Sequence, residues 1–362
     1  MSDTLAPEQK LDLEKAEAFG HHFGGMLNGG FAILSASIGH KTGLFDTMST
    51  LPPSTTHEIA AAAGLQERYV REWLGAMTTS GIVEYDGVSD TYSLPPEHAA
   101  ILTRAAGPGN FAAYAQFLGV MAEVEDKVIQ CFRHGGGVGY EHYTDFHRTM
   151  AELSAMTHDA LLVDVVLPMA PGVTEALESG ITGADVGCGQ GHAVNILARR
   201  FPKSTFVGFD INDGALDVGR KEAADLGLTN ASFDQCDAPT LDRPETFEFM
   251  TTFDAVHDQA DPRGMVAAIF RALKPGGTWL CSDISASSHV GENRDHPLGP
   301  MLYTVSCMHC MTVSLAGDGE GLGAMWGVQQ AREIFTAAGF TDIAVHQIEG
   351  DPANNFYICR KP

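Results

Sequence analysis

The fold of this chain is decided by the stretch Gly183-Ala184-Asp185-Val186-Gly187-Cys188-Gly189-Gln190-Gly191-His192-Ala193. Apolar residues from Ile181 to Val186 predict a short strand, and apolar positions at helical spacing between Ala193 and Phe201 predict a helix directly after it. A strand that runs into a helix through a glycine turn is typical of the first unit of a nucleotide-binding α/β domain. Glycine permits the tight turn and lets a ligand lie against bare backbone.

A second apolar strand, Thr205 to Phe209, ends on Asp210, nineteen residues past Gly191. A carboxylate at this point can accept both hydroxyl groups of a ribose. The glycine spacing is Gly-x-Gly-x-Gly. The spacing that binds the pyrophosphate of a dinucleotide is Gly-x-Gly-x-x-Gly. A nicotinamide cofactor is therefore the weaker alternative.

The glycine turn with its acidic neighbours resembles motif I of the class I methyltransferases that use S-adenosylmethionine (SAM) and release S-adenosylhomocysteine. The resemblance implies that Asp185 lies near the amino-acid end of SAM and that Asp210 binds the ribose. It also implies that Asp237 meets the adenine amino group. The full predicted cofactor site comprises Asp185, Gly187, Gly189, Gly191, Asp210, Ile211, Cys236, Asp237 and Ala238.

Strands and helices alternate from Ile181 onward, which predicts a parallel, doubly wound sheet. We expect a fourth strand over 253–258, a turn at 274–277 into a fifth strand, and a closing antiparallel pair over 342–348 and 355–360. The resemblance makes this a seven-stranded, Rossmann-like methyltransferase domain.

Methyl transfer from a sulfonium requires an aligned nucleophile, removal of its proton and exclusion of water. The run Val256-His257-Asp258-Gln259-Ala260-Asp261-Pro262 looks like the "HDW-x-D" segment of small-molecule O-methyltransferases that carry an N-terminal winged-helix dimerisation domain. The resemblance implies that His257 is the general base, with Asp258 beside it and Asp283 orienting it. The alternative is that His257 only caps the strand or donates to Asp283.

Two positions depart from the family pattern. Gln259 replaces the aromatic residue that follows His-Asp in those enzymes. Their second supporting Glu falls near Met325-Trp326, where no acid stands unless Glu320 supplies it. The orientation of His257 therefore depends on which group takes that place.

A second group of reactive residues lies in the segment Tyr303 to Met311. Cys307 and Cys310 share a helical face, and His309, a second candidate for the base, lies off that face. A C-x-x-C pair can be redox-active or form half of a zinc site, but no partner pair completes a tetrahedron, so we predict no metal. Instead, residues 301–327 are interpreted as a polarisable wall of the acceptor pocket with a movable lid over it, or as an ordinary core helix followed by a flexible loop. Tyr303, Cys307, Cys310 and Trp326 are predicted to contact the acceptor.

The N-terminal part begins with helical periodicity over 8–47, and its stretch from Phe31 to Phe45 is too apolar for a solvated helix. Related enzymes interleave such helices, so the resemblance implies a homodimer. Residues 56–94 read as a winged helix-turn-helix with its β-wing. DNA binding is one interpretation, but the charges of its second helix nearly cancel, which favours a structural or dimerising role.

A long helical pattern follows over 110–133, and then His and aromatic residues crowd a short span. Tyr140, Tyr143 and His147 in that span either line the acceptor pocket or pack helices together. Pro168 and Pro171-Gly172 mark a hinge. We therefore divide the chain into a dimerisation and substrate-capping domain, 1–170, and a SAM-binding domain, 171–362.

Composition limits the partners. The 362 residues include 22 Lys and Arg against 46 Asp and Glu, a formal charge of −24, so the surface repels phosphate backbones and nucleic acid is an unlikely partner. The N-terminus lacks signal-peptide features, and no apolar run is long enough to span a membrane. Seven scattered cysteines suit a reducing compartment, so we expect a cytoplasmic protein.

Together these observations predict a cytoplasmic, homodimeric, SAM-dependent methyltransferase that acts on a small-molecule hydroxyl or thiol. The chain also resembles bacterial winged-helix methyltransferases labelled as transcriptional regulators. The alternatives are therefore a thiol S-methyltransferase and a regulator that senses SAM or a metabolite.

Overall fold

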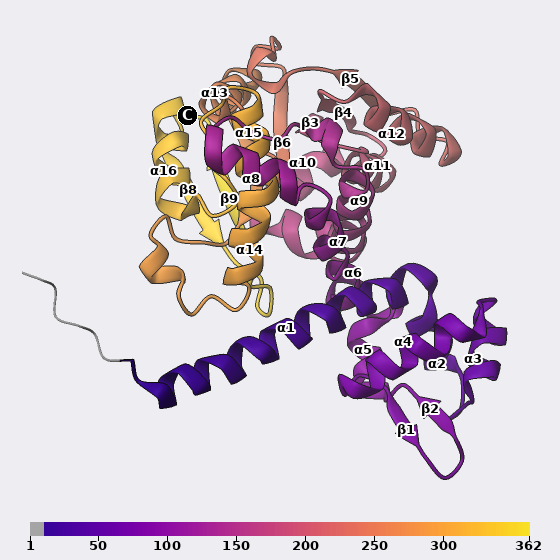
Figure 1. Ribbon diagram of the computed structural model, residues 1–362. Helices are drawn as coiled ribbons and strands as arrows, with labels where there is room; N and C mark the ends of the chain where they lie inside the picture. The colour runs from indigo at the N-terminus through magenta and orange to yellow at the C-terminus, as the bar shows by residue number, and fades with distance from the viewer. Residues whose placement is uncertain (1–10) are drawn as a thin grey trace, which may run out of the picture. The chain divides into compact units, whose positions relative to one another are not determined.

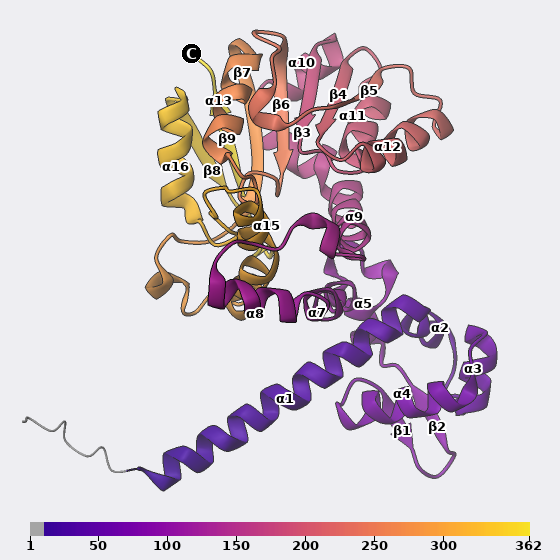
Figure 2. The same cartoon turned by 45° about the horizontal axis from the view of Figure 1, so that its top comes forward.

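The computed structural model describes residues 11–362, which divide into two compact units, one ending at Gly119 and one running from Val120 to Pro362. Figures 1 and 2 show the elements of each unit. The helices between 120 and 170 belong by their contacts to the unit that contains the large sheet.

The first unit is mostly helical and contains the winged helix. Its elements are α1 (Leu13–Thr42), α2 (Leu44–Thr50), α3 (Thr56–Ala63), α4 (Glu67–Thr79), β1 (Glu84–Asp86), β2 (Thr91–Ser93), α5 (Pro96–Leu102), η1 (Arg104–Gly109) and α6 (Phe111–Tyr114). A capping box at Thr55 and Glu58 begins α3, and β1 pairs antiparallel with β2 as the wing. The predicted helix-turn-helix and wing are confirmed.

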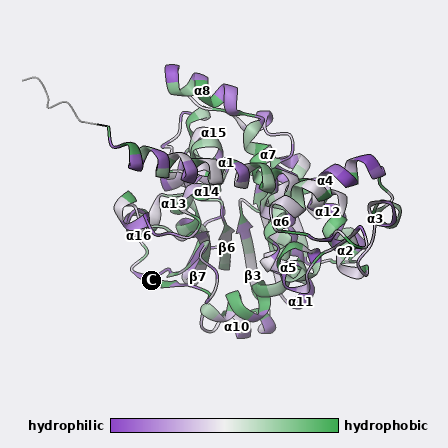
Figure 3. Ribbon diagram, turned by 60° about the horizontal axis from the view of Figure 1, so that its bottom comes forward, coloured by the Kyte–Doolittle hydropathy of each residue, from purple (hydrophilic) through white to green (hydrophobic). Residues whose placement is uncertain are grey.

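The second unit opens with helices that lead to the sheet. They are α7 (Gln116–Ala122, which crosses the unit boundary), α8 (Glu125–His134), η2 (Tyr140–His142), α9 (Phe146–Thr157), η3 (His158–Val166), η4 (Leu167–Met169) and α10 (Val173–Ser179). The single helix predicted over 110–133 is wrong, because it is broken into α6, α7 and α8. Polar and apolar residues alternate along α8 (Figure 3). The segment η3 is a π-helix, whose wider turns were not predicted.

The sheet domain follows with β3 (Thr182–Val186), α11 (His192–Arg200), β4 (Thr205–Asp210), α12 (Asp213–Asp225), β5 (Ala231–Gln235), η5 (Ala238–Thr240), β6 (Phe247–Phe253), α13 (Pro262–Ala272) and β7 (Leu273–Ile284). It ends with η6 (Val290–Asn293), α14 (Gly299–Val305), the π-helix η7 (Ser306–Cys310), α15 (Met311–Ala316), α16 (Gly327–Ala338), β8 (Asp342–His346) and β9 (Asn354–Arg360).

The seven strands lie in the order β5-β4-β3-β6-β7-β9-β8, and β9 runs antiparallel to the other six. The doubly wound sheet and the antiparallel closing pair are thereby confirmed. The strand order reverses between β3 and β6: β4 and β5 are added on one side of β3, and β6 and the later strands on the other. Ligands of such sheets bind at the carboxyl ends of the strands that flank this point.

Two strand predictions need correction. The fourth strand lies at Phe247–Phe253, not at 253–258, because Asp254 has a positive φ of 51° and ends it. The turn predicted at 274–277 lies inside β7, where the register with β6 shifts.

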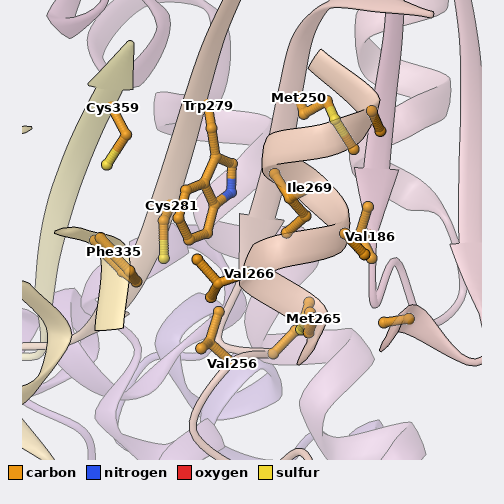
Figure 4. Close-up of a cluster of buried hydrophobic side chains, with 14 of the residues drawn as sticks. Val186, Met250, Val256, Met265, Val266, Ile269, Trp279, Cys281, Phe335 and Cys359 are labelled. Atoms are coloured by element: carbon orange, nitrogen blue, oxygen red, sulfur yellow. The ribbon is translucent and has the colours of Figure 1, made fainter. Parts of the chain in front are cut away.

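Successive strand residues face two different cores, so the domain has helices on both faces of the sheet. Met250, Trp279 and Tyr357 pack against α13 and α16, whereas Phe249, Leu280 and Phe356 pack against α10, α11 and α12. In the first core the Trp279 and Phe335 rings meet at 4.7 Å (Figure 4). This packing makes a rigid platform for the loops at the strand ends.

Among the described residues, no single helix is long and apolar enough to cross a membrane. One bent pair, Phe146–Met169 with Val173–Ser179, reaches that length and composition, but its apolar side chains, such as Leu162 and Leu177, lie in the second core.

Candidate active site

The glycine turn between β3 and α11 has the backbone that its sequence predicts. Gly187, Gly189 and Gly191 have positive φ angles of 73°, 54° and 71°. A Cβ at Gly187 would lie 2.6 Å from Ala255, and one at Gly191 would lie 2.2 Å from Phe233. At Gly189 no atom lies within 4 Å of that position, so this is where a ligand can approach the bare backbone.

Asp210 is tied to the glycine turn by backbone donors. Its Oδ2 accepts from the Gly189 N–H at 2.8 Å, and its Oδ1 accepts from the Asn212 N–H at 2.8 Å. A carboxylate offers about four acceptor positions, so both oxygens can still accept ribose hydroxyls. The adjacent Ile211 is 61% exposed, which leaves its side chain free to cover a ligand.

The other predicted cofactor residues lie at the same edge of the sheet. The Cys236 N–H donates to the Asp210 carbonyl at 2.9 Å, which joins the ends of β4 and β5. Asp237 is exposed beyond β5, and Ala238 is buried behind it. The structure therefore brings the predicted adenosine-binding residues to one place, the carboxyl ends of β3, β4 and β5.

Asp185 is buried in β3 and accepts a hydrogen bond from the Thr251 hydroxyl at 2.8 Å. Burial raises the pKa of its carboxyl to about 7, against the effect of the Thr251 hydrogen bond. A buried carboxylate of this kind is better accommodated beside a positive charge, and SAM supplies a sulfonium and an ammonium. The residues present therefore fit this cofactor.

His257, on the loop after β6, and Asp283, near the end of β7, form a buried pair. The His257 Nδ1 and the Asp283 Oδ1 are 2.7 Å apart, and both side chains are almost inaccessible to solvent. Burial alone would lower the pKa of His257, but the Asp283 carboxylate and the neighbouring Cys310 raise it well above its ordinary value. The predicted contact is therefore present, and Asp283 fixes the ring with Nδ1 protonated.

Trp326 stands where the resemblance expects a second supporting Glu. Its indole N–H donates to the Asp283 Oδ1 at 2.9 Å, and the Ile284 N–H donates to the same oxygen at 2.8 Å. Trp326 is buried and thus acts through Asp283 in this arrangement. Glu320, the acid considered for this role, instead pairs with Arg263 at 3.2 Å on the surface, so that assignment is wrong.

Asp258 and Gln259 complete the loop after β6. The Asp258 Oδ2 accepts from the Tyr140 hydroxyl. The Gln259 Nε2 donates to the Ala255 carbonyl at 2.9 Å, which closes the loop that displays His257. Burial and the neighbouring Asp258 raise the pKa of Tyr140 well above its usual range, so Tyr140 remains a neutral donor.

His309 lies in a box of aromatic rings. Its ring stacks on Phe146 with a centroid distance of 3.4 Å, and it meets Tyr143 at 4.8 Å and Tyr140 at 5.5 Å. His147 stacks on Tyr140 at 5.6 Å. Neither His309 nitrogen has a hydrogen-bond partner, and burial, with His257 and His147 nearby, lowers its pKa well below the ordinary value. His309 is therefore neutral and has unused hydrogen-bonding capacity.

The remaining acceptor candidates divide into two groups. Cys310 is buried near His257, and the Tyr143 hydroxyl donates to the Met308 carbonyl at 2.5 Å. Cys307 is half-buried, and the Tyr303 hydroxyl accepts from the Asn293 Nδ2 at 2.9 Å, away from the histidines. The π-helix η7 changes the spacing on which the shared cysteine face depended. Among residues 11–362 no three His, Cys, Asp or Glu side chains are arranged to bind a metal.

The segment predicted as a lid is attached to the His257 loop. The Gly323 N–H donates to the His257 carbonyl at 3.1 Å, and the Ser314 hydroxyl donates to the Gln259 carbonyl at 2.7 Å. A Cβ at Gly319 would lie 2.4 Å from the Ala260 Cα. The segment therefore covers the loop closely, while its motion stays a prediction.

Asp254 was missed by the sequence reasoning. It combines a positive φ of 51° with an Oδ1 that is buried without a partner. Burial and the nearby Asp283 raise the pKa of its carboxyl to about 7. Non-glycine residues with a strained backbone concentrate at functional sites. The sequence alone does not predict a positive φ at an aspartate.

Comparison with known proteins agrees with this geometry. Residues 30–104 match the family described as "Rv2258c-like winged HTH domain", and residues 177–339 match the family described as "Methyltransferase domain". The ubiquinone biosynthesis O-methyltransferase of Pseudomonas fluorescens (strain Pf0-1) is 32% identical over 103 residues, which are 28% of this chain and 43% of that protein. The chain thus spans less than half the length of that curated relative.

Two solved structures share the fold over nearly the whole chain. Human N-acetylserotonin methyltransferase in complex with SAM is 17% identical, with a TM-score of 0.63 and 99% of each chain covered. The mitomycin 7-O-methyltransferase MmcR is 16% identical, with a TM-score of 0.68 and 96% and 100% covered. The predicted winged helix and the Rossmann-like methyltransferase domain are confirmed.

Proposed function

We propose that this chain, which joins a winged-helix domain to a SAM-dependent methyltransferase domain, transfers the methyl group of SAM to a hydroxyl on a small aromatic molecule. One observation carries the proposal: His257, which is paired with the buried Asp283, lies near His309 and the aromatic rings that surround it. The cofactor supplies an electrophilic methyl group when it is bound. The chain must supply a base, a surface for the acceptor and exclusion of water.

In this proposal His257 removes the proton of the acceptor hydroxyl through Nε2, because Nδ1 is engaged by Asp283. Asp283 orients the ring and stabilises the imidazolium that forms, and Trp326 keeps the carboxylate in place. The raised pKa of His257 means that the ring gives up its own proton at a higher pH than an ordinary histidine does. The rate should therefore still increase with pH where an ordinary histidine is already deprotonated.

The acceptor binds among Tyr140, Tyr143, His147 and His309. Aromatic side chains at this density favour a planar ring, which gains stacking as well as apolar burial. His309 is neutral and unpartnered, so it can exchange a hydrogen bond with a polar group of the acceptor. Cys310 lies near His257, and contacts of the acceptor with Cys310, Cys307 and Tyr303 are part of the proposal.

The cofactor side of the proposal rests on the glycine turn and on Asp185, Asp210 and Asp237. Residues 171–362 bind SAM, and residues 1–170 act in dimerisation and in capping the acceptor. The contacts of Tyr140 with Asp258 and of Tyr143 with Met308 support a capping role for the end of that first segment.

A homodimer through α1 belongs to the same proposal. Large apolar side chains along this helix are exposed in the single chain, including Leu13, Phe19, Phe23, Met26, Leu27 and Phe31. Burying them against a second copy would remove them from water. Light scattering should give twice the chain mass, and Phe23→Glu with Phe31→Glu should give monomers. A cytoplasmic location is supported by seven free thiols.

The test is transfer of labelled methyl from SAM to panels of phenols, carboxylates and thiols, read by mass spectrometry. We expect label on phenols, and His257→Gln should lower kcat by about 10²–10⁴-fold. Label on thiols alone would favour the S-methyltransferase alternative. Steeply salt-dependent binding of duplex DNA, with no label on any acceptor, would favour the regulator.

A further inference from the structure

The methionyl carboxylate of SAM needs hydrogen-bond donors, and the glycine turn has few left. The Gly187 and Cys188 N–H groups both donate to the Phe209 carbonyl, at 2.8 and 3.0 Å. The Gly189 N–H donates to Asp210, and the Gly191 N–H donates to the Cys188 carbonyl at 2.8 Å. The turn is therefore closed by its own bonds, which leaves the carboxylate to other groups.

The loops at the crevice offer no Lys or Arg, and the His257 ring in them is already paired with Asp283. The segments 187–192 and 253–258 contain no Lys or Arg, while Asp185, Asp210, Asp254 and Asp258 bring negative charge. The imidazole of His192 is already engaged on both sides, by Glu222 at 2.7 Å and by Asp159 at 3.0 Å. A donor for an anionic group must therefore come from an element that packs on these loops.

His158 comes from such an element, the π-helix η3. Its ring centroid lies 4.6 Å from that of Phe253, the last residue of β6. The next residue, Asp159, is bound to His192, which directly follows the glycine turn. These two contacts bracket the crevice between β3 and β6, where a doubly wound sheet binds its ligand.

The ring of His158 also has an unused donor. Its Nδ1 is buried without a hydrogen-bond partner. Burial, with His192 nearby, lowers the pKa of His158 to about 4, so the ring is neutral at pH 7 and carries one N–H. Because Nδ1 has no acceptor, the proton is better placed on Nε2, at the edge of a half-buried ring.

We infer that His158 binds the methionyl carboxylate of SAM by donating its Nε2–H. His192 contacts Asp159, and Glu222 in turn contacts His192, so the π-helix is fixed beside the glycine turn. This inference rests on the proposed function, because it assigns one contact within the same cofactor site.

The experiment is calorimetric titration of the full chain with SAM and with decarboxylated SAM, which lacks only the carboxylate. His158→Phe keeps a ring against Phe253 and removes both nitrogens. We expect it to weaken SAM about ten- to hundredfold while decarboxylated SAM binds as before, since a hydrogen bond to a charged group contributes at this scale. His158→Gln, which restores an N–H near the Nε2 position, should recover part of the affinity.

A matched control is Gln190→Met. Gln190 lies in the glycine turn and carries an uncharged side-chain donor that could bind the carboxylate in place of His158. If Gln190→Met shows the selective loss and His158→Phe does not, the assignment is wrong. Equal weakening of both ligands by His158→Phe would mean a purely structural role and would also overturn it. If the unaltered protein binds neither ligand, the proposed function itself fails, and that outcome is distinguishable from the others.

Discussion

Asp283→Asn tests the centre of the proposed site. The carboxylate is fully buried and its Oδ1 accepts three donors, from His257, Trp326 and the Ile284 backbone, at 2.7–2.9 Å. Asparagine preserves the shape and can still accept at this oxygen. What it removes is the negative charge that raises the pKa of His257.

The sign of the effect follows from that pKa. A raised pKa in the folded state contributes stability at pH values below the pKa of the unfolded histidine, and this stability is lost as the pH rises through the folded value. Without the carboxylate, a charged His257 would be buried unpaired, which costs about 3–5 kcal/mol. The ring can avoid that cost by losing its proton, so the pKa falls.

Two measurements check this reasoning. Chemical unfolding from pH 6 to pH 9 should show a destabilisation by Asp283→Asn that is largest at pH 6 and shrinks with rising pH. The pH–rate profile of methyl transfer should have its rising limb at lower pH in the variant, with a lower maximum because the ring is less well oriented. Asp242→Asn, an exposed carboxylate, is the control. A rising limb that does not move in Asp283→Asn would refute the coupling between the two residues.

Three further substitutions separate the parts of the site. Tyr140→Phe removes the hydrogen bond to Asp258 and should lower kcat/KM for the acceptor roughly tenfold or more, with SAM affinity unchanged by calorimetry. Trp326→Phe keeps an aromatic ring but leaves Asp283 without its indole donor, and thermal unfolding should show a loss of about 1–3 kcal/mol. Gly191→Ala combines a φ of 71° with a Cβ that would lie 2.2 Å from a ring carbon of β5, so both stability and SAM affinity should fall.

The cofactor half of the site was predictable because its determinants are local. A strand, a glycine turn and a helix follow one another in sequence, and Asp210 ends the next strand, so parallel pairing brings them together. The contact between His257 and Asp283 was predicted from the resemblance to O-methyltransferases, and the pairing of β6 with β7 brings the two residues together. Their roles in catalysis remain proposals.

The acceptor half could not be predicted in this way. Tyr140 reaches Asp258 and Tyr143 reaches Met308 across more than a hundred residues, through loop and helix packing that has no periodic signal. The π-helices at His158–Val166 and Ser306–Cys310 shift side-chain directions by a fraction of a turn relative to an α-helix. Residue spacing therefore does not fix which way Cys307 points, and it gave no reason to single out His158.

The electrostatics of the crevice lead to a last prediction, which concerns protons. Burial raises the pKa values of Asp185 and Asp254 to about 7, so near neutrality each carboxyl is partly protonated. A cation bound beside them favours the ionised form and lowers these pKa values, so binding of SAM should release protons around pH 7. S-adenosylhomocysteine lacks the sulfonium charge and should release fewer.

Calorimetry at pH 7 in buffers of different ionisation enthalpy measures the number of protons directly. Asp185→Asn and Asp254→Asn should each reduce the release seen with SAM. Equal proton release by the two ligands would mean that the buried carboxylates do not respond to the sulfonium. If SAM does release more protons, the two carboxylates bind SAM more tightly than S-adenosylhomocysteine. Because methyl transfer removes the sulfonium charge, they would then favour release of the product, which links these two carboxylates to turnover.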